Sequence, residues 1–321
     1  ILHAMATELD LKDDVAKWET QYARQKQLLD AALWSEADKL YLNRNWNGEF
    51  STQLTPDIFF VLAAGIPSPA RAAQILEVLR DPKKFGGALQ LPSLARNDAA
   101  FPQTATASPN SRWRGRVAAL TNYLVYFGLK RYGFEADAAQ LARQSTQLVR
   151  DAWLREAKVY DSFPSVMAAN AETLPSASVP PGAWFGGLMW LPGIEELLAL
   201  DPLTGLTIGN EAVSEDARLT NLPLTGSLFD IAIGPQQLAI TRNGQLELEV
   251  DAPTRLYNYQ SRDHLLSFLN QTSKPLNFRL PAVAEREISV SVDGKIIGTY
   301  PPGKPARFKL APGAHRVVIV K

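Results

Sequence analysis

The chain has 321 residues, 46% of them hydrophobic, which is enough to bury one large core or two smaller ones. Lys and Arg together number 33, as do Asp and Glu, so no net charge attracts nucleic acid or anionic lipid. No apolar run reaches the roughly 18–20 residues of a membrane-spanning helix. We therefore expect no nucleic-acid partner and no membrane span.

The sequence contains no cysteine, which excludes disulfides, thiolate nucleophiles and Cys-ligated metals. Its histidines, His3, His264 and His315, are far apart, which argues against a His-rich metal site or a Ser-His-Asp triad. We expect neither a metal nor an organic cofactor. A cysteine-free chain suits any compartment, and a bacterial periplasmic or secreted location is only slightly favoured.

The chain begins within an apolar helical pattern, without the basic region and cleavage site of a signal peptide. We therefore expect a fragment whose earlier part is missing. Between Leu11 and Leu33, apolar residues recur at spacings of three, four or seven, which predicts a long amphipathic helix. A polar, turn-rich stretch at 43–48 ends it.

Two shorter helices and a long loop are predicted next. One helix begins near Thr55, and the other runs from Pro69 to Leu79, with Ser68 as its cap and Pro69 in its first turn. Residues 82–112 lack periodicity and are rich in Pro, Gly, Ser and Asn. A loop of this length inside a domain is usually functional or disordered.

Three more helices complete the predicted helical part. Two of them, at about 116–131 and 135–156, are separated by Gly133. A second long loop, 158–182, leads into an apolar helix over 184–200. Long and short helices that alternate in this way suit antiparallel pairs, with the loops gathered at one end.

The character of the sequence changes after Asp201. Asn243-Gly244 and Asp293-Gly294 each lie between short alternating runs, which is a strong hairpin signal. A last strand is predicted at 316–320. We therefore predict a mainly α protein with an appended all-β domain. We place the helical domain at 1–205 and a β-sandwich-like domain at 206–321.

Carboxylates are the expected catalytic groups, because His and Cys are so scarce. Glycoside hydrolysis needs two of them, one acid and one base or nucleophile, and sugar sites add aromatic rings, Arg and Asn. Such residues gather in or beside the two long loops: Asp98, Trp113, Arg114, Arg116, Asp161 and Trp184. The alternative is that Asp98 and Asp161 are ordinary solvated loop carboxylates.

Residues 113–133 carry the most specific resemblance to a known family. They contain a Trp-Arg-Gly-Arg loop followed by a helix with Asn122-Tyr123. Segments at 41–57 and 85–101 extend the match collinearly, over roughly residues 10–205. The chain resembles the (α/α)6-toroid glycoside hydrolases, which include processing α-glucosidase I, trehalase and bacterial mannosylglycerate hydrolases.

This resemblance implies part of a helical toroid and inverting hydrolysis of an α-linked gluco- or manno-configured sugar. In the family, a Glu serves as general base, and Asp161 stands in the corresponding position here. Its carboxylate would be withdrawn by one bond length, about 1.5 Å. Inverting carboxylates lie about 6.5–9.5 Å apart, so the shift can be absorbed.

Two further features depart from the family. An aromatic residue that usually follows the Trp-Arg-Gly-Arg loop is replaced by Val117-Ala118, although these residues could simply begin the next helix. The family's general-acid Asp lies upstream of this chain, so no residue is assigned that role. Three early carboxylates are interpreted as a polar helix entry: Asp10, Asp13 and Asp14.

The remaining site assignments each have a structural alternative. The candidate substrate-binding residues are Trp113, Arg114, Arg116, Asp98, Asn122 and Trp184. The tryptophans could instead lie in the core, the Arg114 side chain could brace its loop, and Asp98 or Asn122 could cap a turn or helix.

Two rival functions remain open. One is a non-catalytic glycan-binding or envelope scaffold protein on a degenerate toroid. The other is a polysaccharide lyase that uses Tyr160 as its base. In the β domain, Tyr257, Tyr259 and Arg262 could form a sugar-binding face, although ordinary strand aromatics are the favoured interpretation. The expected partners are carbohydrate and either the missing toroid part or a partner chain.

Overall fold

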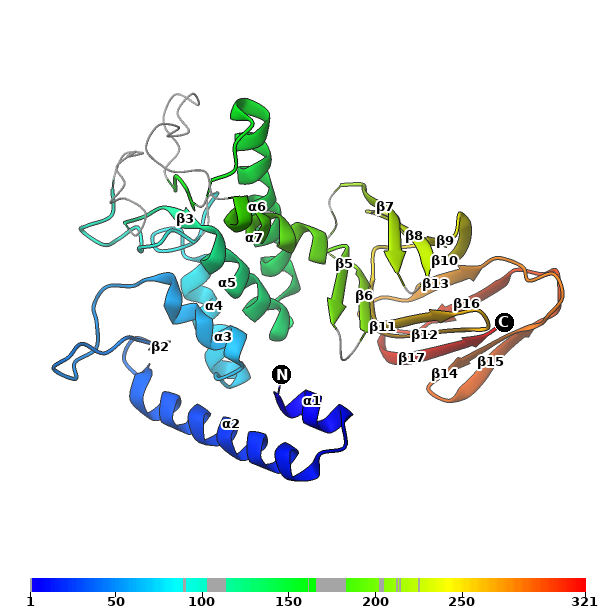
Figure 1. Ribbon diagram of the computed structural model, residues 1–321, viewed down its shortest axis with the longest axis horizontal. Coiled ribbons are helices and arrows are strands. Elements are labelled where there is room, and N and C mark those ends of the chain that lie inside the picture. Colours follow the sequence, from blue (N-terminus) through cyan, green and yellow to red (C-terminus); the bar gives the residue numbers. More distant parts are fainter. Residues whose placement is uncertain are drawn as a thin grey trace. The chain divides into compact units, whose positions relative to one another are not determined.

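The computed structural model describes residues 2–88, 91–102, 114–160, 162–165, 183–201, 205–211, 213, 215–224 and 226–321; at 183–185 and 201 it describes the backbone alone. The chain divides into two compact units, Ile1–Gly193 and Ile194–Lys321. The first is mainly helical and the second is built of strands (Figure 1). None of the described helices combines the length and the apolar character needed to cross a membrane.

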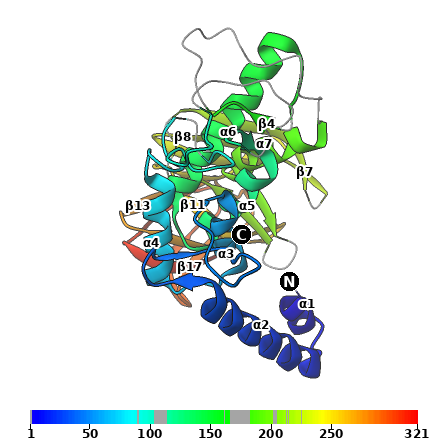
Figure 2. The ribbon, with the colours of Figure 1, turned by 90° about the vertical axis from the view of Figure 1, so that its left-hand side faces the viewer.

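The first two helices, α1 (Leu2–Glu8) and α2 (Lys12–Leu33), fold back beside each other (Figures 1 and 2). The predicted long helix is confirmed, but none of its residues is buried. Polar contacts attach α2 to the rest of the unit. The Tyr22 hydroxyl donates to the Gly65 carbonyl at 2.8 Å, and Arg71 forms an ion pair with Asp30 at 3.1 Å.

The core of the helical unit lies between helices of 4 to 22 residues. These are the 3-10 helix η1 (Pro56–Phe59), α3 (Phe60–Ala64), α4 (Pro69–Arg80), α5 (Ala119–Arg131) and α6 (Glu135–Glu156). As predicted, Ser68 caps α4 by accepting a hydrogen bond from the Arg71 amide. Gly128 lets α5 approach α3 closely, because a Cβ there would lie 2.7 Å from the Leu62 Cβ.

Two helix boundaries differ from the prediction because short strands replace helical turns. The helix α5 begins at Ala119, since Val117–Ala118 forms β3 and pairs with β4 (Ser162–Phe163). The apolar helix α7 (Ala183–Glu195) ends before residue 200, since Leu198–Asp201 forms β5. A further two-residue pair joins β1 (Trp34–Ser35) to β2 (Leu40–Tyr41).

The β unit contains two antiparallel sheets. In spatial order, the six-stranded sheet consists of β16 (Ala306–Leu310), β13 (Leu276–Leu280), β10 (Gln245–Val250), β9 (Gln237–Arg242), β8 (Ser227–Gly234) and β7 (Ala217–Leu224). The seven-stranded sheet consists of β15 (Lys295–Tyr300), β14 (Ile288–Val292), β17 (Gly313–Val320), β12 (Leu265–Thr272), β11 (Arg255–Arg262), β6 (Gly205–Gly209) and β5.

The two predicted hairpins are confirmed. Asn243 and Gly244 connect β9 to β10 with φ values of 51° and 76°. Asp293 and Gly294 connect β14 to β15 with φ values of 52° and 79°. Two successive positive φ values match the twist of antiparallel strands, and Asn-Gly and Asp-Gly adopt them at low cost.

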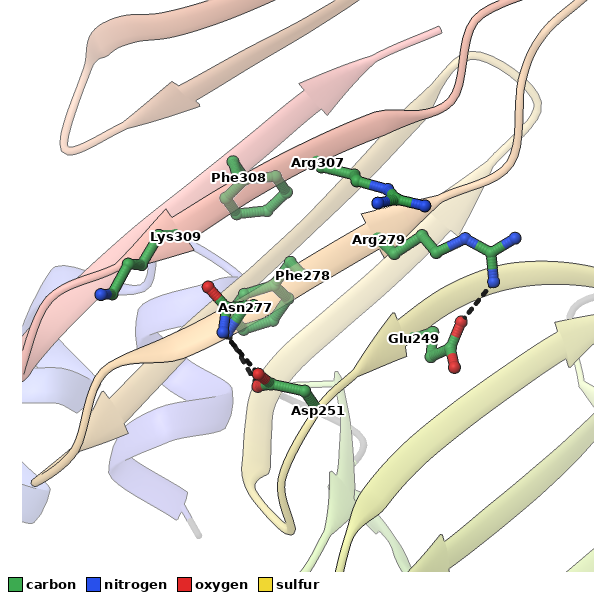
Figure 3. A pocket seen from close by; sticks show the side chains of 8 residues that line it. All are labelled: Glu249, Asp251, Asn277, Phe278, Arg279, Arg307, Phe308 and Lys309. Atoms are coloured by element: carbon green, nitrogen blue, oxygen red, sulfur yellow. Dashed lines mark hydrogen bonds and ion pairs between the residues drawn. The ribbon is translucent and has the colours of Figure 1, made fainter.

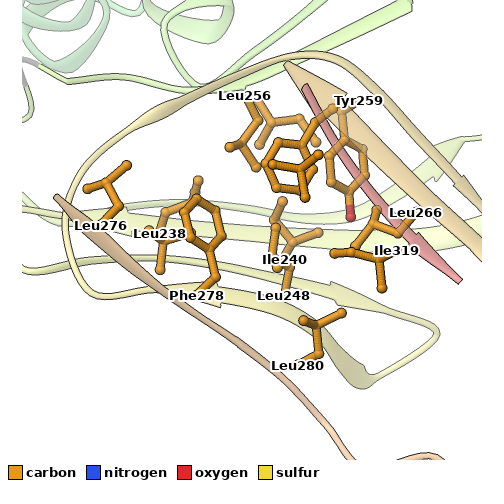
Figure 4. Packing of buried hydrophobic residues seen from close by; sticks show 14 of the residues in the cluster. Leu238, Ile240, Leu248, Leu256, Tyr259, Leu266, Leu276, Phe278, Leu280 and Ile319 are labelled. Atoms are coloured by element: carbon orange, nitrogen blue, oxygen red, sulfur yellow. The ribbon is translucent and has the colours of Figure 1, made fainter. Parts of the chain in front are cut away.

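Residues from both sheets form one hydrophobic cluster (Figure 4). A row of stacked rings crosses it, from Tyr259 and Phe268 of the seven-stranded sheet to Phe278 and Phe308 of the other. Successive ring centroids are 6.4, 5.6 and 5.0 Å apart. Offset rings at such distances attract each other beyond the gain from burial alone. The aromatic row therefore fixes β13 and β16 from their inner side.

Candidate functional site

The predicted sugar site falls partly outside the described residues. Trp113 and Asp161 lie outside them, as does the side chain of Trp184, whose backbone belongs to α7. The other candidates are described: Asp98, Arg114, Arg116 and Asn122. All four lie in the helical unit, and the side chain of Arg116 contacts β4.

The turn at 114–116 is fixed against the preceding loop. The Gly115 amide donates to the Ser93 hydroxyl at 2.9 Å, and the Ser93 amide donates to the Arg116 carbonyl at 2.8 Å. Gly115 has a φ of +100°, which side chains rarely adopt. A Cβ there would also lie 2.8 Å from the Pro102 ring and 2.9 Å from Phe101. The glycine of the Trp-Arg-Gly-Arg sequence is therefore required by the turn itself.

Arg116 ties this turn to β4. Its side chain is only 4% exposed, and its guanidinium donates to the Ser162 hydroxyl at 3.0 Å and to the Ser162 carbonyl at 2.6 Å. Backbone pairing of β3 with β4 reinforces the contact. These bonds hold Ser162, the residue that directly follows Asp161 in the chain.

Tyr160, which directly precedes Asp161, is fixed as well. Its ring is buried and meets Phe163 edge-on at 6.3 Å, and its hydroxyl donates to the Glu156 carboxylate. Burial, and then the bond to Glu156, raise the pKa of Tyr160 to about 12. A phenol in this state is a poor proton acceptor near neutral pH, which argues against the lyase alternative.

The remaining candidates have different surroundings. The Asp98 carboxylate accepts a hydrogen bond from the Ala100 amide at 2.8 Å, as a turn carboxylate does. Asn122 is 1% exposed and donates to the Ser145 hydroxyl at 3.0 Å, which joins α5 to α6. Its Oδ1 atom has no hydrogen-bond partner within the described part of the chain. Arg114 is exposed.

Three positioning residues were not predicted from the sequence. Ser93 accepts a hydrogen bond from the Gly115 amide in the turn, and Ser162 accepts one from Arg116. Arg96 donates to the Gly86 carbonyl at 2.8 Å and so holds two parts of the first long loop together. Only Arg96 offered a signal, because it lies within the segment that resembles the toroid family. The contacts of the two serines join segments that are far apart in the sequence, so no local sequence pattern around a serine predicts them.

The ionisation of Tyr160 gives a testable pH dependence. Its folded pKa of about 12 exceeds the unfolded value of about 10, so its contribution is complete below pH 10 and is lost as the pH rises towards 12. Between pH 10 and pH 12, the free energy of unfolding of Tyr160→Phe should therefore fall by roughly 1–2 kcal/mol less than that of the parent chain. Urea unfolding followed by circular dichroism at several pH values checks this, and parallel profiles would contradict it.

No three His, Asp or Glu side chains gather in a metal-binding arrangement within the described ranges. The site therefore offers positioned polar groups and an exposed arginine beside a ribbon whose two strands are tied together.

Comparisons with solved structures give distant similarities. A mannosylglycerate hydrolase from Thermus thermophilus is 24% identical over 59% of this chain and 40% of its own, with a TM-score of 0.45. A neutral trehalase from Saccharomyces cerevisiae is 16% identical over 56% and 30%, with a TM-score of 0.44. A sialidase is 13% identical over 79% and 25%, with a TM-score of 0.62, which is a likeness of fold alone.

The chain thus spans less than half the length of each of these proteins. No functionally curated protein matches it significantly. Residues 1–161, however, match the sequence profile of the mannosylglycerate hydrolase MGH1-like glycoside hydrolase domain. This match covers half of the chain and includes the turn at 114–116 and helices α1 to α6, so the chain belongs to the MGH1-like glycoside hydrolase family.

Proposed function

We propose that this chain is part of an inverting glycoside hydrolase that acts on an α-linked gluco- or manno-configured glycan. Residues 1–205 would form the C-terminal part of an (α/α)6 toroid, and residues 206–321 a β-sandwich-like accessory domain. Family membership over 1–161 supports the glycosidase class. Two sheets that share one hydrophobic cluster support the accessory domain.

In this proposal, Asp161 is the general base that activates water. Arg114 and the rings of Trp113 and Trp184 would contact the sugar, together with Asp98 and Asn122. Arg116 would act indirectly, because its guanidinium is committed to Ser162. No residue of 1–321 is assigned as general acid.

One observation carries the assignment of the base: both chain neighbours of Asp161 are held in place. Tyr160 is fixed by burial and by Glu156, and Ser162 by Arg116 and by pairing with Ala118. A general base must be held within hydrogen-bond reach of its water, so a fixed backbone on both sides suits the role. Ordinary solvated loop carboxylates do not need such support.

The carbohydrate is one expected partner, and a second protein surface is another. Apolar side chains on α5 and α6 are exposed, among them Phe127, Trp153 and Leu154. Trp153 and Leu154 are neighbours in the chain, and contiguous exposed apolar groups mark interaction sites. We propose that the rest of the toroid or a partner chain covers them.

Stereochemistry tests the proposed reaction directly. The intact protein should release, from a panel of α-glucosides and α-mannosides, a sugar whose first-formed anomer is β, as proton NMR can detect. Water attack on the face opposite the leaving group dictates this inversion. First release of the α anomer would contradict the mechanism. Binding of glycans without any turnover would instead identify a non-catalytic glycan-binding protein.

A further inference from the structure

The outer face of the six-stranded sheet carries an ordered set of charged side chains that the proposed catalytic site does not use. Strands β13 and β16 contribute two side chains each, and β10 with the residue that follows it contributes two more, in two cross-strand rows. One row is Glu249, Arg279 and Arg307; the other is Asp251, Asn277 and Lys309. They line a hollow of about 550 Å³ (Figure 3).

Positive charge on this face exceeds negative charge, and its distribution is uneven. Glu249 binds Arg279 at 2.7 Å, while Asp251 accepts from the Asn277 backbone amide at 2.9 Å. Arg307 lies directly opposite Arg279 in the strand register, and like charges in this position repel each other. The one carboxylate in this row pairs with Arg279 alone, and the side chains of the two adjacent arginines extend in the same direction (Figure 3).

Neither the Arg307 nor the Lys309 side chain has an ion-pair or hydrogen-bond partner among the residues that the structure describes. An oxyanion placed on this row would relieve the repulsion and receive charge-assisted hydrogen bonds, which are stronger than neutral ones. Arginine offers such a group two parallel N–H donors.

Two stacked rings anchor the strands beneath this face. Phe278 and Phe308 alternate with the outer residues, point inward, and stack at 5.0 Å with nearly parallel rings. Little ordering of β13 and β16 would therefore be needed when a ligand binds, which favours affinity.

The chemistry of the face selects its ligand. None of the six outward side chains in the two rows is apolar, whereas the centre of a protein interface is depleted in charged residues and enriched in aromatic ones. The carboxylates of Glu249 and Asp251 would repel a polyphosphate, but they and the Asn277 amide can bind hydroxyl groups. Two rows on three strands span about 10 by 7 Å, enough for one or two sugar rings.

We infer that this face binds a carboxylate-bearing saccharide, with the carboxylate on Arg307 and Lys309 and the hydroxyls on Asp251 and Asn277. The inference is independent of the proposed hydrolysis, because its readout is binding rather than turnover. A failure to detect saccharide binding on this face would therefore not contradict the proposed hydrolysis, and a failure to detect hydrolysis would not contradict the proposed binding.

Isothermal titration of the 321-residue chain with trigalacturonate tests the site, with the carboxyl-reduced neutral trisaccharide as the matched ligand. We expect the acidic form to bind at least about tenfold more tightly. The double variant Arg307→Gln/Lys309→Gln should lose that preference. Lys295→Gln removes a cation from β15 of the other sheet and should leave it unchanged.

Three results would overturn the inference. Trigalacturonate binding that survives in the double variant would place the saccharide elsewhere. Equal weakening by Lys295→Gln would indicate general charge attraction without a site. Absence of saccharide binding, together with self-association that the double variant abolishes, would assign the face to protein docking.

Discussion

Asp161→Asn is expected to lower kcat for glycoside hydrolysis by the intact protein by about 10²–10⁴-fold, the range that a positioned general base contributes. The amide keeps the size of the carboxylate but cannot take a proton from water. Substrate affinity should change much less, since the proposed sugar contacts come from other side chains. Initial rates on the best substrate of the panel, with and without the substitution, measure both effects.

Two matched variants make this result interpretable. Asp161→Glu restores the residue that the family places here and should retain far more activity than Asp161→Asn. Asp151→Asn makes the same chemical change on the surface of α6, where the carboxylate accepts a bond from Gln147, and should leave kcat unaltered. Full activity in Asp161→Asn would remove Asp161 from the mechanism and identify it as a loop carboxylate.

The helix and hairpin boundaries that were predicted well are those with local signals. Ser68 and Pro69 mark the start of α4, and Asn243-Gly244 marks the turn between β9 and β10. Each signal acts over a few residues, so one sequence suffices to find it. The two short strands that replaced helical turns, β3 and β5, have no such signal, because only their pairing with distant strands defines them.

The alternation of inward and outward side chains along a strand also gives a wrong prediction where the strand contains a bulge. In β10, strict alternation would place Glu247 and Glu249 on the same face, outside the core. The register shifts between Leu246 and Leu248, and Glu247 is buried. There it accepts hydrogen bonds from the Tyr259 hydroxyl at 2.8 Å and from the Ser261 hydroxyl at 2.6 Å. Tyr259 is therefore committed to the interior and does not belong to a sugar-binding face.

The candidate site shows the same division between local and distant information. Resemblance drew attention to the Trp-Arg-Gly-Arg turn, and the φ of Gly115 explains why glycine occupies it. The residues that this turn contacts are distant in the sequence. Ser93 lies 22 residues from its partner Gly115, and Ser162 lies 46 residues from its partner Arg116. Arg116 was predicted to bind substrate, and its burial against Ser162 became visible only when these segments were brought together.

Arg255→Met should cause the largest loss of stability in the β unit. Arg255 on β11 forms an ion pair with Glu196 at 3.3 Å, and the two side chains are only 4% and 7% exposed. Its guanidinium also donates to the Gly209 carbonyl at 3.0 Å. Arg255→Met removes this ion pair from a carboxylate that stays buried, and breaking a buried pair in this way costs roughly 3–5 kcal/mol. The loss should appear in urea unfolding of the chain, monitored by circular dichroism.

The cost of breaking the Arg255–Glu196 pair is not the same as the net stability that the intact pair contributes. A double variant separates these two free energies. In Glu196→Met/Arg255→Met no charge remains buried, so much of the lost stability should return. The exposed pair Glu249 and Arg279 is the matched control. Its atoms are closer, at 2.7 Å, but its side chains are 32% and 49% exposed. Arg279→Met should therefore cost no more than about 1 kcal/mol. Equal losses from Arg255→Met and Arg279→Met would show that desolvation of the buried partner does not govern the effect.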